Sequence, residues 1–223
     1  MTRCSAVPSA SSDHLRVPWV LASRNEGKLV ELRALFATAG IEVIDLREAG
    51  IPEDLTAEEG IESFDSFEEN ALAKARYFAT LLPGRDVVAD DSGLAIDALG
   101  GAPGVRSKRW AGRGDLHGAA LDAANNAQLV AAMRGRRVRT ARFVCAAAWC
   151  DGGSDLVARG EVAGDIVDTP AGAHGFGYDP HVMVEELGMT MAEATLEEKQ
   201  RVSHRARAFA ALLDALRDAR RME

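Results

Sequence analysis

Cysteine is scarce in this sequence, and its spacing builds no framework. The 223 residues include three cysteines, Cys4, Cys145 and Cys150. An odd number without a CxxC pair argues against a disulfide scaffold and against a zinc knuckle. We therefore expect free thiols in a reducing cytoplasm.

Long apolar runs and blocks of like charge are also missing. No apolar segment approaches the roughly 18 residues of a membrane span, and the N-terminus lacks the apolar core of a usual signal peptide. The formal charge is −8 with a pI of about 5.2. No run of Lys or Arg marks a surface for a nucleic-acid polymer or an anionic membrane. We expect a soluble cytoplasmic protein whose anionic ligand is small.

The length and composition favour one domain. A hydrophobic content of 47% is enough for a sizeable core, and no internal repeat is visible. Residues 1–16 are rich in Ser, Ala and Pro and have no apolar periodicity. We interpret them as a disordered extension or the result of a start codon placed too early, and assign them no function. The predicted domain is 17–223.

The first predicted elements form a strand, a polar turn and a helix. The apolar run 17–22 favours a buried strand, and Ser23 and Glu26 have the spacing of a capping box. This order directs backbone N–H groups and the positive end of the helix dipole at an anion. Asn25 and Lys28 are not needed by a cap, and both are good phosphate donors. The predicted helix has an apolar face and a C-terminal glycine, namely Leu29, Leu32, Leu35, Phe36 and Gly40.

Two adjacent carboxylates, Asp90 and Asp91, follow the apolar run 87–89. We predict that this strand ends there, at the carboxyl edge where open α/β sheets bind ligands, before a turn at Ser92 and Gly93. An aspartic protease would need a second Asp-Ser/Thr-Gly loop, and the chain has one. An aspartyl phosphotransferase would need a D-x-D spacing, which is missing. Carboxylates that hold Mg²⁺ beside phosphates fit better.

A second helix brings a further lysine. Its predicted start has the capping spacing of Ser66 and Glu69, and Lys74 follows one turn after Asn70. A lone helix lysine is usually solvated, but together with Lys28 it can bind phosphate oxygens. Upstream of this helix, Glu62 in an acidic loop is a third candidate ligand for Mg²⁺.

The second half of the chain predicts an antiparallel pair of strands. Residues 140–150 and 156–166 alternate in character and are separated by the hairpin signal Asp151-Gly152-Gly153. The sheet is therefore mixed, and Cys145 and Cys150 face opposite sides. Residues 119–133 favour a scaffold helix.

A glycine and aromatic segment suits a flat ligand. Glycines in the stretch AGAHGFGYDPHV let the backbone approach a planar base, and Phe176 and Tyr178 offer stacking faces. A packed loop with core aromatics explains the same pattern equally well. Lys199, His204 and Arg205 concentrate positive charge near the start of the last helix.

Five motifs in one order carry a family resemblance. SRNEGK, ESFDSFEENALAKA, ADDSGL with GGAPGV, GFGYDP and EEKQRVSHR resemble the inosine triphosphate pyrophosphatase family, also called Ham1-like or dITP/XTP pyrophosphatases, over about 17–216. The resemblance implies Mg²⁺-dependent hydrolysis of ITP, dITP and XTP to the monophosphate and pyrophosphate, which removes deaminated purines from the nucleotide pool. It also implies an elongated mixed β-sheet flanked by helices, two lobes with a central substrate cleft, and a homodimer.

The resemblance also implies a role for each matching residue. Asp91 resembles the general base and metal ligand, Asp90 its acidic neighbour, and Glu62 a second metal-site carboxylate. Catalysis is expected from Asp91, Asp90, Lys28 and Lys74, and metal binding from Asp91, Glu62 and Asp90. The expected substrate-binding residues are Ser23, Arg24, Asn25, Glu26, Gly27, Lys28, Asn70, Lys74, Ser92, Gly93, Phe176, Gly177, Tyr178, Asp179, Lys199, His204 and Arg205.

Two departures and two alternatives stay open. Phe64 replaces a glycine that is common in the family's E-T-G-x-T-F stretch, which affects the backbone beside Glu62. Arg24 replaces a frequent glycine, and its side chain either helps to bind the phosphates or points away. The alternatives are a pyrophosphatase for other nucleotides on a related scaffold, and a nucleotide-binding sensor without hydrolysis.

Overall fold

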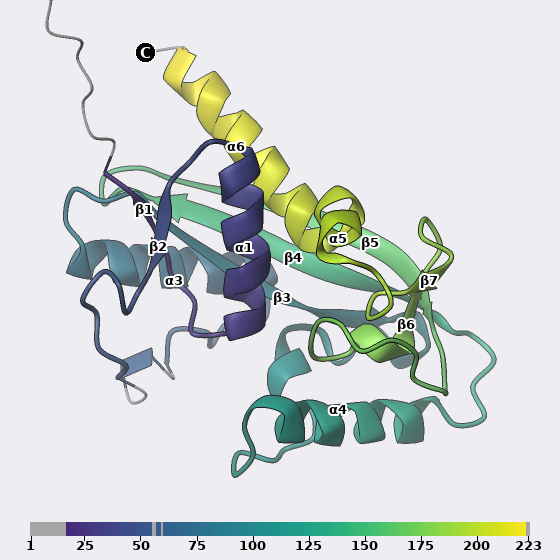
Figure 1. The fold of residues 1–223 in the computed structure, drawn as a ribbon. Helices are drawn as coiled ribbons and strands as arrows, with labels where there is room; N and C mark the ends of the chain where they lie inside the picture. Colours follow the sequence, from purple (N-terminus) through teal and green to yellow (C-terminus); the bar gives the residue numbers. More distant parts are fainter. Residues whose placement is uncertain (1–16, 55–56, 59, 222–223) are drawn as a thin grey trace, which may run out of the picture.

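A seven-stranded mixed sheet runs through the molecule (Figure 1). The computed structural model describes residues 17–54, 57–58 and 60–221, so Cys4 and the predicted extension 1–16 lie outside them. The strand order is β2-β1-β3-β4-β5-β6-β7. β1 is parallel to β2 and β3, and the other pairs are antiparallel. The strands are β1 Trp19–Leu21, β2 Val43–Asp45, β3 Val87–Ile96, β4 Thr140–Cys150, β5 Asp155–Ile166, β6 Val182–Val184 and β7 Met189–Thr190.

Helices cover both faces of the sheet, which confirms the predicted mixed α/β class. α3 packs against one face, whereas α1 and α6 pack against the other. No helix among the described residues is long and apolar enough to cross a membrane. The helices are α1 Glu26–Thr38, α3 Phe67–Leu81, α4 Gly118–Met133, α5 Leu196–Val202 and α6 His204–Arg221, with 3₁₀ helices η1 Asp97–Leu99, η2 Gly104–Arg109 and η3 Asp179–His181.

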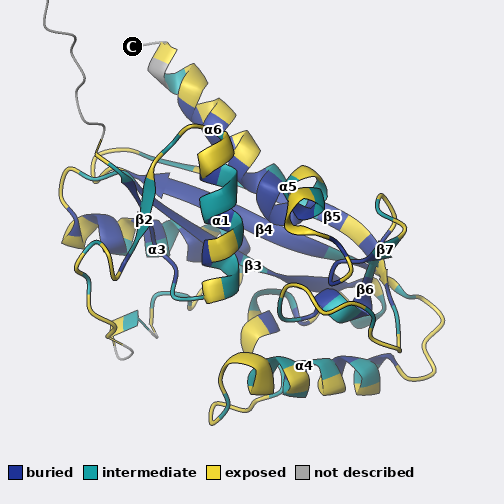
Figure 2. Cartoon of the chain, viewed as in Figure 1, coloured by how far each residue is buried: buried dark blue, intermediate teal, exposed yellow. Residues whose placement is uncertain are grey.

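The central strand β4 divides the core by its alternation. Ala146 and Cys150 belong to the cluster under α3, and Cys145 and Ala147 belong to the cluster under α1 and α6. The prediction that Cys145 and Cys150 face opposite sides is therefore confirmed, and both are free thiols. Figure 2 shows β3 and β4 buried along almost their whole lengths.

One glycine sets the position of α6 on the sheet. A Cβ added to Gly160 of β5 would lie 2.3 Å from both the Ala208 nitrogen and the His204 oxygen. This distance is too short for any side chain. The backbone of α6 can therefore contact β5 directly at this point because residue 160 is a glycine. The first residues of α6 are thereby held against the sheet.

The prediction that the strand ends at Asp90 is wrong. β3 continues to Ile96, and Asp90 and Asp91 pair with Ala147 and Ala146 of β4. The Ser-Gly turn is absent because the antiparallel partner continues the hydrogen bonding past residue 89. The parallel neighbour β1 pairs with β3 only as far as Val88, so the two carboxylates lie beyond the end of β1 instead.

Gly93 is explained by packing. A Cβ at this position would lie 2.4 Å from both the Gly104 oxygen and Ser107 Oγ. The Ser107 hydroxyl accepts a hydrogen bond from the Leu94 nitrogen at 2.8 Å. The glycine therefore lets η2 lie directly on β3, beside the two carboxylates.

Candidate active site

The N-terminus of α1 begins the site. Asn25 is the N-cap, and its Oδ1 accepts a hydrogen bond from the Lys28 nitrogen at 2.9 Å. Ser23 Oγ accepts from the Asn25 nitrogen at 3.3 Å. The predicted capping box of Ser23 and Glu26 is therefore wrong. Asn25 has the N-cap to N3 spacing with Lys28, and the Glu26 side chain is 78% exposed.

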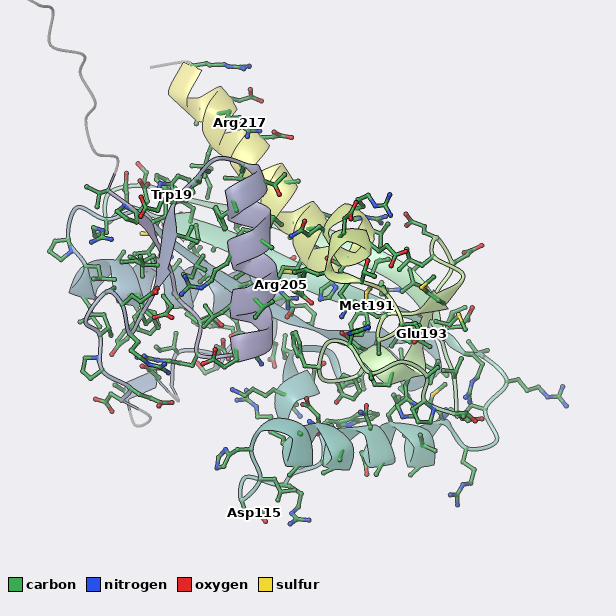
Figure 3. The ribbon with its side chains drawn as sticks, viewed as in Figure 1. Trp19, Asp115, Met191, Glu193, Arg205 and Arg217 are labelled. Atoms are coloured by element: carbon green, nitrogen blue, oxygen red, sulfur yellow. The ribbon has the colours of Figure 1, made fainter. Side chains whose placement is uncertain are left out.

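Asp90 lies at the bottom of the site and is fully buried. Its Oδ2 is 3.0 Å from Lys28 Nζ and 3.3 Å from Arg205 Nε. Burial raises the pKa of this carboxyl, but Lys28 and Arg205 outweigh that effect and hold the pKa well below its usual range. Arg205, labelled in Figure 3, reaches from α6 to both β3 and α1. Asp90 is thus an ionised group enclosed by cations.

Asp91 has different surroundings. Its Oδ2 accepts a hydrogen bond from Asn70 Nδ2 at 2.9 Å, and its Oδ1 accepts from the Ser92 nitrogen at 2.9 Å. The same Asn70 amide bonds to both the nitrogen and the oxygen of Phe64. Asn70 therefore fixes the backbone beside Glu62 to the Asp91 carboxylate, while the Phe64 side chain is 45% exposed.

Glu62 and Lys74 form an ion pair beside Asp91. Burial raises the pKa of Glu62, but the charges of Lys74 and Lys28 outweigh this effect, so the pKa of Glu62 is lowered overall. Burial raises the pKa of Asp91, and the negative charge of Glu62 raises it as well. Lys28 and Lys74 lower this pKa, but it stays raised overall. Both lysines therefore lie close enough to both carboxylates to shift their pKa values.

Sequence reasoning missed two cations of η2 next to this group. Arg109 Nη2 donates to the Glu62 backbone oxygen at 3.1 Å, and the charge of Lys108 also lowers the pKa of Glu62. The signal was present in the sequence, because the Gly-rich segment leads directly into two consecutive basic residues at 108–109.

The glycine and aromatic segment lies against α1. A Cβ on Gly27 would be 2.3 Å from Cδ1 of Phe176, so the ring packs directly on the helix backbone. Arg205 Cζ is 5.7 Å from the centroid of the same ring. The structure thus places the end of α1 predicted to bind phosphate beside the segment predicted to bind a base.

This segment is anchored by α4 and η2. The Gly177 nitrogen donates to Asp122 Oδ2 at 2.9 Å, and Asn126 Nδ2 donates to the Gly177 oxygen at 3.0 Å, both from α4. The Tyr178 hydroxyl donates to the Ser107 oxygen of η2 at 2.8 Å. Tyr178 is buried and belongs to the core, whereas Phe176 lies at the site. The packed-loop interpretation therefore holds for Tyr178, and the ligand-binding interpretation stays a prediction for Phe176.

Buried charges follow at the start of the last helices. Lys199 Nζ lies 2.6 Å from Asp179 Oδ2, and burial raises the pKa of Asp179 to about 6 although Lys199 opposes the shift. His204 stacks on Phe143 with ring centroids 4.9 Å apart. Burial, and then the charge of Arg205, lower the pKa of His204 well below its ordinary value. Both effects favour the neutral form of His204.

Two further side chains complete the arrangement. Arg24 donates to Glu58 Oε1 and to the Pro52 oxygen, both at 2.8 Å, so its guanidinium points to the loop before α3. Glu31 of α1, which sequence reasoning missed, forms an ion pair with Arg205. Its three-residue spacing from Lys28, typical of one helix face, was the available signal.

The carboxylates differ in their fitness for a metal ion. No group of three or more His, Cys, Asp or Glu in the described part of the chain has a metal-binding arrangement. Mg²⁺ at nucleotide sites commonly uses one or two carboxylates together with substrate phosphates. Glu62, whose side chain is 34% exposed, and the neighbouring Asp91 fit that requirement. Asp90 does not, because it is fully buried and its Oδ2 contacts two cations.

Comparisons with known proteins agree on one family. The Ham1 family matches residues 19–215. The dITP/XTP pyrophosphatase of Burkholderia pseudomallei is 48% identical over 214 residues, which cover 95% of this chain and 99% of that protein. The dITP/XTP pyrophosphatase of Ralstonia nicotianae is 47% identical over 89% of this chain and 96% of that protein. The Staphylococcus aureus Ham1 protein structure has a TM-score of 0.74 and 35% identity, over 91% of this chain and 100% of that chain.

Proposed function

The chain belongs to the Ham1 family, and from that premise we propose that it hydrolyses the deaminated purine nucleoside triphosphates dITP, ITP and XTP to the monophosphate and pyrophosphate. The observation that carries the proposal is the near-full-length similarity to dITP/XTP pyrophosphatases. The geometry supports it, because Lys28 and Lys74 flank the Asp90 and Asp91 pair at the N-terminus of α1.

Mg²⁺ is the proposed cofactor, with Glu62 and Asp91 as its protein ligands. When bound, the ion neutralises negative charge on the phosphates and polarises the reacting phosphoryl group. Asp90 was predicted to be a third ligand. Its full burial and its two cationic partners instead support a role in positioning Lys28 and Arg205.

The proposed chemistry assigns the proton transfer to Asp91. Its raised pKa makes it a better base than an exposed carboxylate, and Asn70 fixes its orientation. Asp91 would orient a water molecule and accept its proton as the water attacks the α-phosphorus in line with the leaving pyrophosphate. Lys28, Lys74 and the N–H groups of α1 would stabilise the charge that develops on pyrophosphate.

Base selection is proposed for the surface between Phe176 and the start of α6. Phe176 offers a stacking face, and Arg205 lies over its ring. Lys199 is a second donor nearby, because it binds the Asp179 oxygen that also accepts from the Phe176 nitrogen at 3.4 Å. Inosine and xanthosine carry a 6-keto oxygen that can accept from such donors. Adenine has an amino group there, which would leave each donor unpaired at a cost of about 1–3 kcal/mol.

The same proposal covers the organisation of the protein. We propose that residues 17–223 act as a single domain, with two lobes around a central substrate cleft, and that the enzyme is a cytoplasmic homodimer. Its partner is then a small nucleoside triphosphate and not a nucleic-acid polymer or a membrane.

The test is pyrophosphate release from ITP, XTP, dITP, ATP, GTP and UTP, with Mg²⁺ and with EDTA. Metal-dependent release confined to the inosine and xanthosine nucleotides is the expected result. Turnover of the other bases would support the alternative of a pyrophosphatase for other nucleotides. No turnover of any substrate would contradict the proposal and leave a non-hydrolysing nucleotide sensor.

A further inference from the structure

Two side chains of α4 hold a single residue of the glycine and aromatic segment. The Gly177 nitrogen donates to Asp122 Oδ2 at 2.9 Å, and the Gly177 oxygen accepts from Asn126 Nδ2 at 3.0 Å. Asp122 and Asn126 are one helical turn apart and therefore lie on the same face of α4. Gly177 has a φ of 61°, a backbone conformation that suits glycine. One helix therefore fixes both polar backbone groups of this residue, and we call Asp122 and Asn126 the α4 clamp.

The clamped glycine directly follows Phe176. The ring of Phe176 packs on the backbone of Gly27 in α1, and Arg205 lies over it. The residues that precede Phe176, 172–175, are exposed, whereas Tyr178 is buried. The orientation of the Phe176 ring therefore depends on how the backbone that follows it is held.

The same helix also holds η2, which contacts the backbone of Glu62. Asn125 accepts from the Ala111 nitrogen through Oδ1 at 2.9 Å and donates from Nδ2 to the Lys108 oxygen at 3.0 Å. The next residue of η2, Arg109, donates to the Glu62 oxygen at 3.1 Å. Two consecutive asparagines of α4 therefore connect the proposed metal side of the site with the base segment.

The α4 clamp belongs to a helix that is itself fixed in the core. Leu129 and Met133 of α4 are fully buried and lie in the same core cluster as Tyr178. Among the described residues, Oδ1 of Asn126 has no hydrogen-bond partner, so the side chain holds the segment through its donor. A replacement that removes this donor therefore tests the bond to Gly177 directly.

We propose that Asp122 and Asn126 are positioning residues for base recognition, which hold the Phe176 ring in the orientation that stacks on a purine base. The inference rests on the proposed function, because it assumes that a base binds beside this ring. Stacking requires a ring whose plane is fixed, and a displacement of about 1 Å can cost on the order of 100-fold in rate. Release of the α4 clamp should weaken contacts with the base and leave the phosphate region at the N-terminus of α1 in place.

The test uses the two products of the proposed reaction, because each reports on one part of the site. Deoxyinosine monophosphate (dIMP) carries the base, and pyrophosphate does not. In Asn126→Asp, which is nearly isosteric and removes the donor, KM for dITP and the inhibition constant of dIMP should rise by about tenfold. The kcat for dITP and the inhibition constant of pyrophosphate should change less than about threefold.

Matched variants separate the hydrogen bonds from the effect of charge. Gln128→Glu makes the same amide-to-acid change at an exposed position of α4 and should match wild type. Asp122→Ala removes the acceptor for the Gly177 nitrogen and should resemble Asn126→Asp. Asp122→Asn removes the charge but keeps an acceptor, so its constants should stay within about threefold of wild type. Thermal unfolding shows whether each variant is folded, and Asn126→Ala takes the place of Asn126→Asp if the acid does not fold.

The outcomes separate the inference from its alternatives. Equal rises in the inhibition constants of dIMP and pyrophosphate would make the α4 clamp a general structural feature and overturn the inference. Wild-type constants in both Asn126→Asp and Asp122→Ala would also overturn it. An equal effect of Asp122→Asn and Asp122→Ala would assign the result to charge and overturn it as well. No hydrolysis of dITP by wild type would instead contradict the proposed function, so the two failures are distinguishable.

Discussion

At the residue scale, two neighbouring carboxylates with the same sequence context have opposite electrostatic surroundings. Asp90 lies between two cations and has a lowered pKa, whereas Asp91 faces an amide and has a raised pKa. Adjacent residues of a strand point to opposite faces of the sheet, which accounts for the difference. The sequence identified the pair but could not divide the roles, because Arg205 is 115 residues away from Asp90.

Asp91→Asn tests the division of roles. The amide is nearly isosteric, but it cannot accept a proton, so we expect kcat for dITP to fall by about 100-fold or more. Thermal stability should be retained, because a partly desolvated carboxylate is replaced by a neutral group. Asp115→Asn, at an exposed carboxylate, is the control. Activity within about threefold of wild type would remove Asp91 as the general base.

His204 makes the stability depend on pH with a defined sign. The buried imidazole stays neutral, whereas in the unfolded chain it binds a proton below a pKa of about 6.5. Its contribution is therefore complete above that pH and is lost as the pH falls. Relative to His204→Gln, the unfolding free energy of wild type should decrease by up to about 1.4 kcal/mol per pH unit between about 6.5 and 5.

Urea unfolding at several pH values measures this difference, and contributions of other groups that titrate alike in both proteins cancel. His117→Gln, at an exposed histidine, should give a curve parallel to that of wild type. A constant difference between wild type and His204→Gln across the pH range would show that His204 takes up a proton in the folded protein as well.

At the scale of the elements, local signals predicted the helices well and the site strand poorly. The predicted cap at Ser66 is present, because its side chain accepts a hydrogen bond from the Glu69 nitrogen in the first turn of α3. The end of β3 was misplaced because Ser92 and Gly93 are common turn residues, and their true constraint is the contact with η2. That contact depends on packing between segments, which no local pattern contains.

Substitutions of Asn25 can distinguish a role in helix capping from a role in ligand binding. As the N-cap of α1 it accepts a hydrogen bond through Oδ1, and its amide nitrogen has no hydrogen bond to the described residues. Asn25→Asp retains the acceptor and suits the helix dipole, so stability should stay within about 0.5 kcal/mol of wild type. The added charge should nevertheless raise KM for dITP by about tenfold or more, because it repels the triphosphate.

Asn25→Ala is the comparison, since it loses the cap and should also lower stability by about 1 kcal/mol. Thermal unfolding and dITP kinetics on the three proteins provide the measurement. If Asn25→Asp binds dITP as well as wild type does, the end of α1 is a structural cap and the triphosphate lies elsewhere.

At the scale of the whole molecule, the site joins segments that are distant in sequence. α1, β3 and α6 contribute Lys28, Asp90 and Arg205, and the core cluster under α1 and α6 contains residues of all three elements. The arrangement is possible because β1 ends beside its parallel neighbour β3, which continues along its antiparallel partner β4. The sequence indicated the mixed sheet and the participating motifs, and the strand order required the structure.

The proposed N-terminal boundary of the domain, residue 17, can be tested by truncation. The Pro18 oxygen accepts a hydrogen bond from Arg85 Nη2 at 2.8 Å, and the Trp19 nitrogen donates to the Glu42 oxygen at 2.9 Å. These contacts attach the chain at residues 18 and 19, and the family match begins at residue 19. A chain beginning at residue 17 should therefore retain dITP hydrolysis within about twofold and unfold in one cooperative transition.

A chain beginning at residue 23 lacks β1 and should not fold, because the strand that leads into α1 beside the two carboxylates is then missing. Activity assays and urea unfolding of both truncated proteins are the measurement. A large loss of activity in the protein that begins at residue 17 would show that residues 1–16 contribute to function.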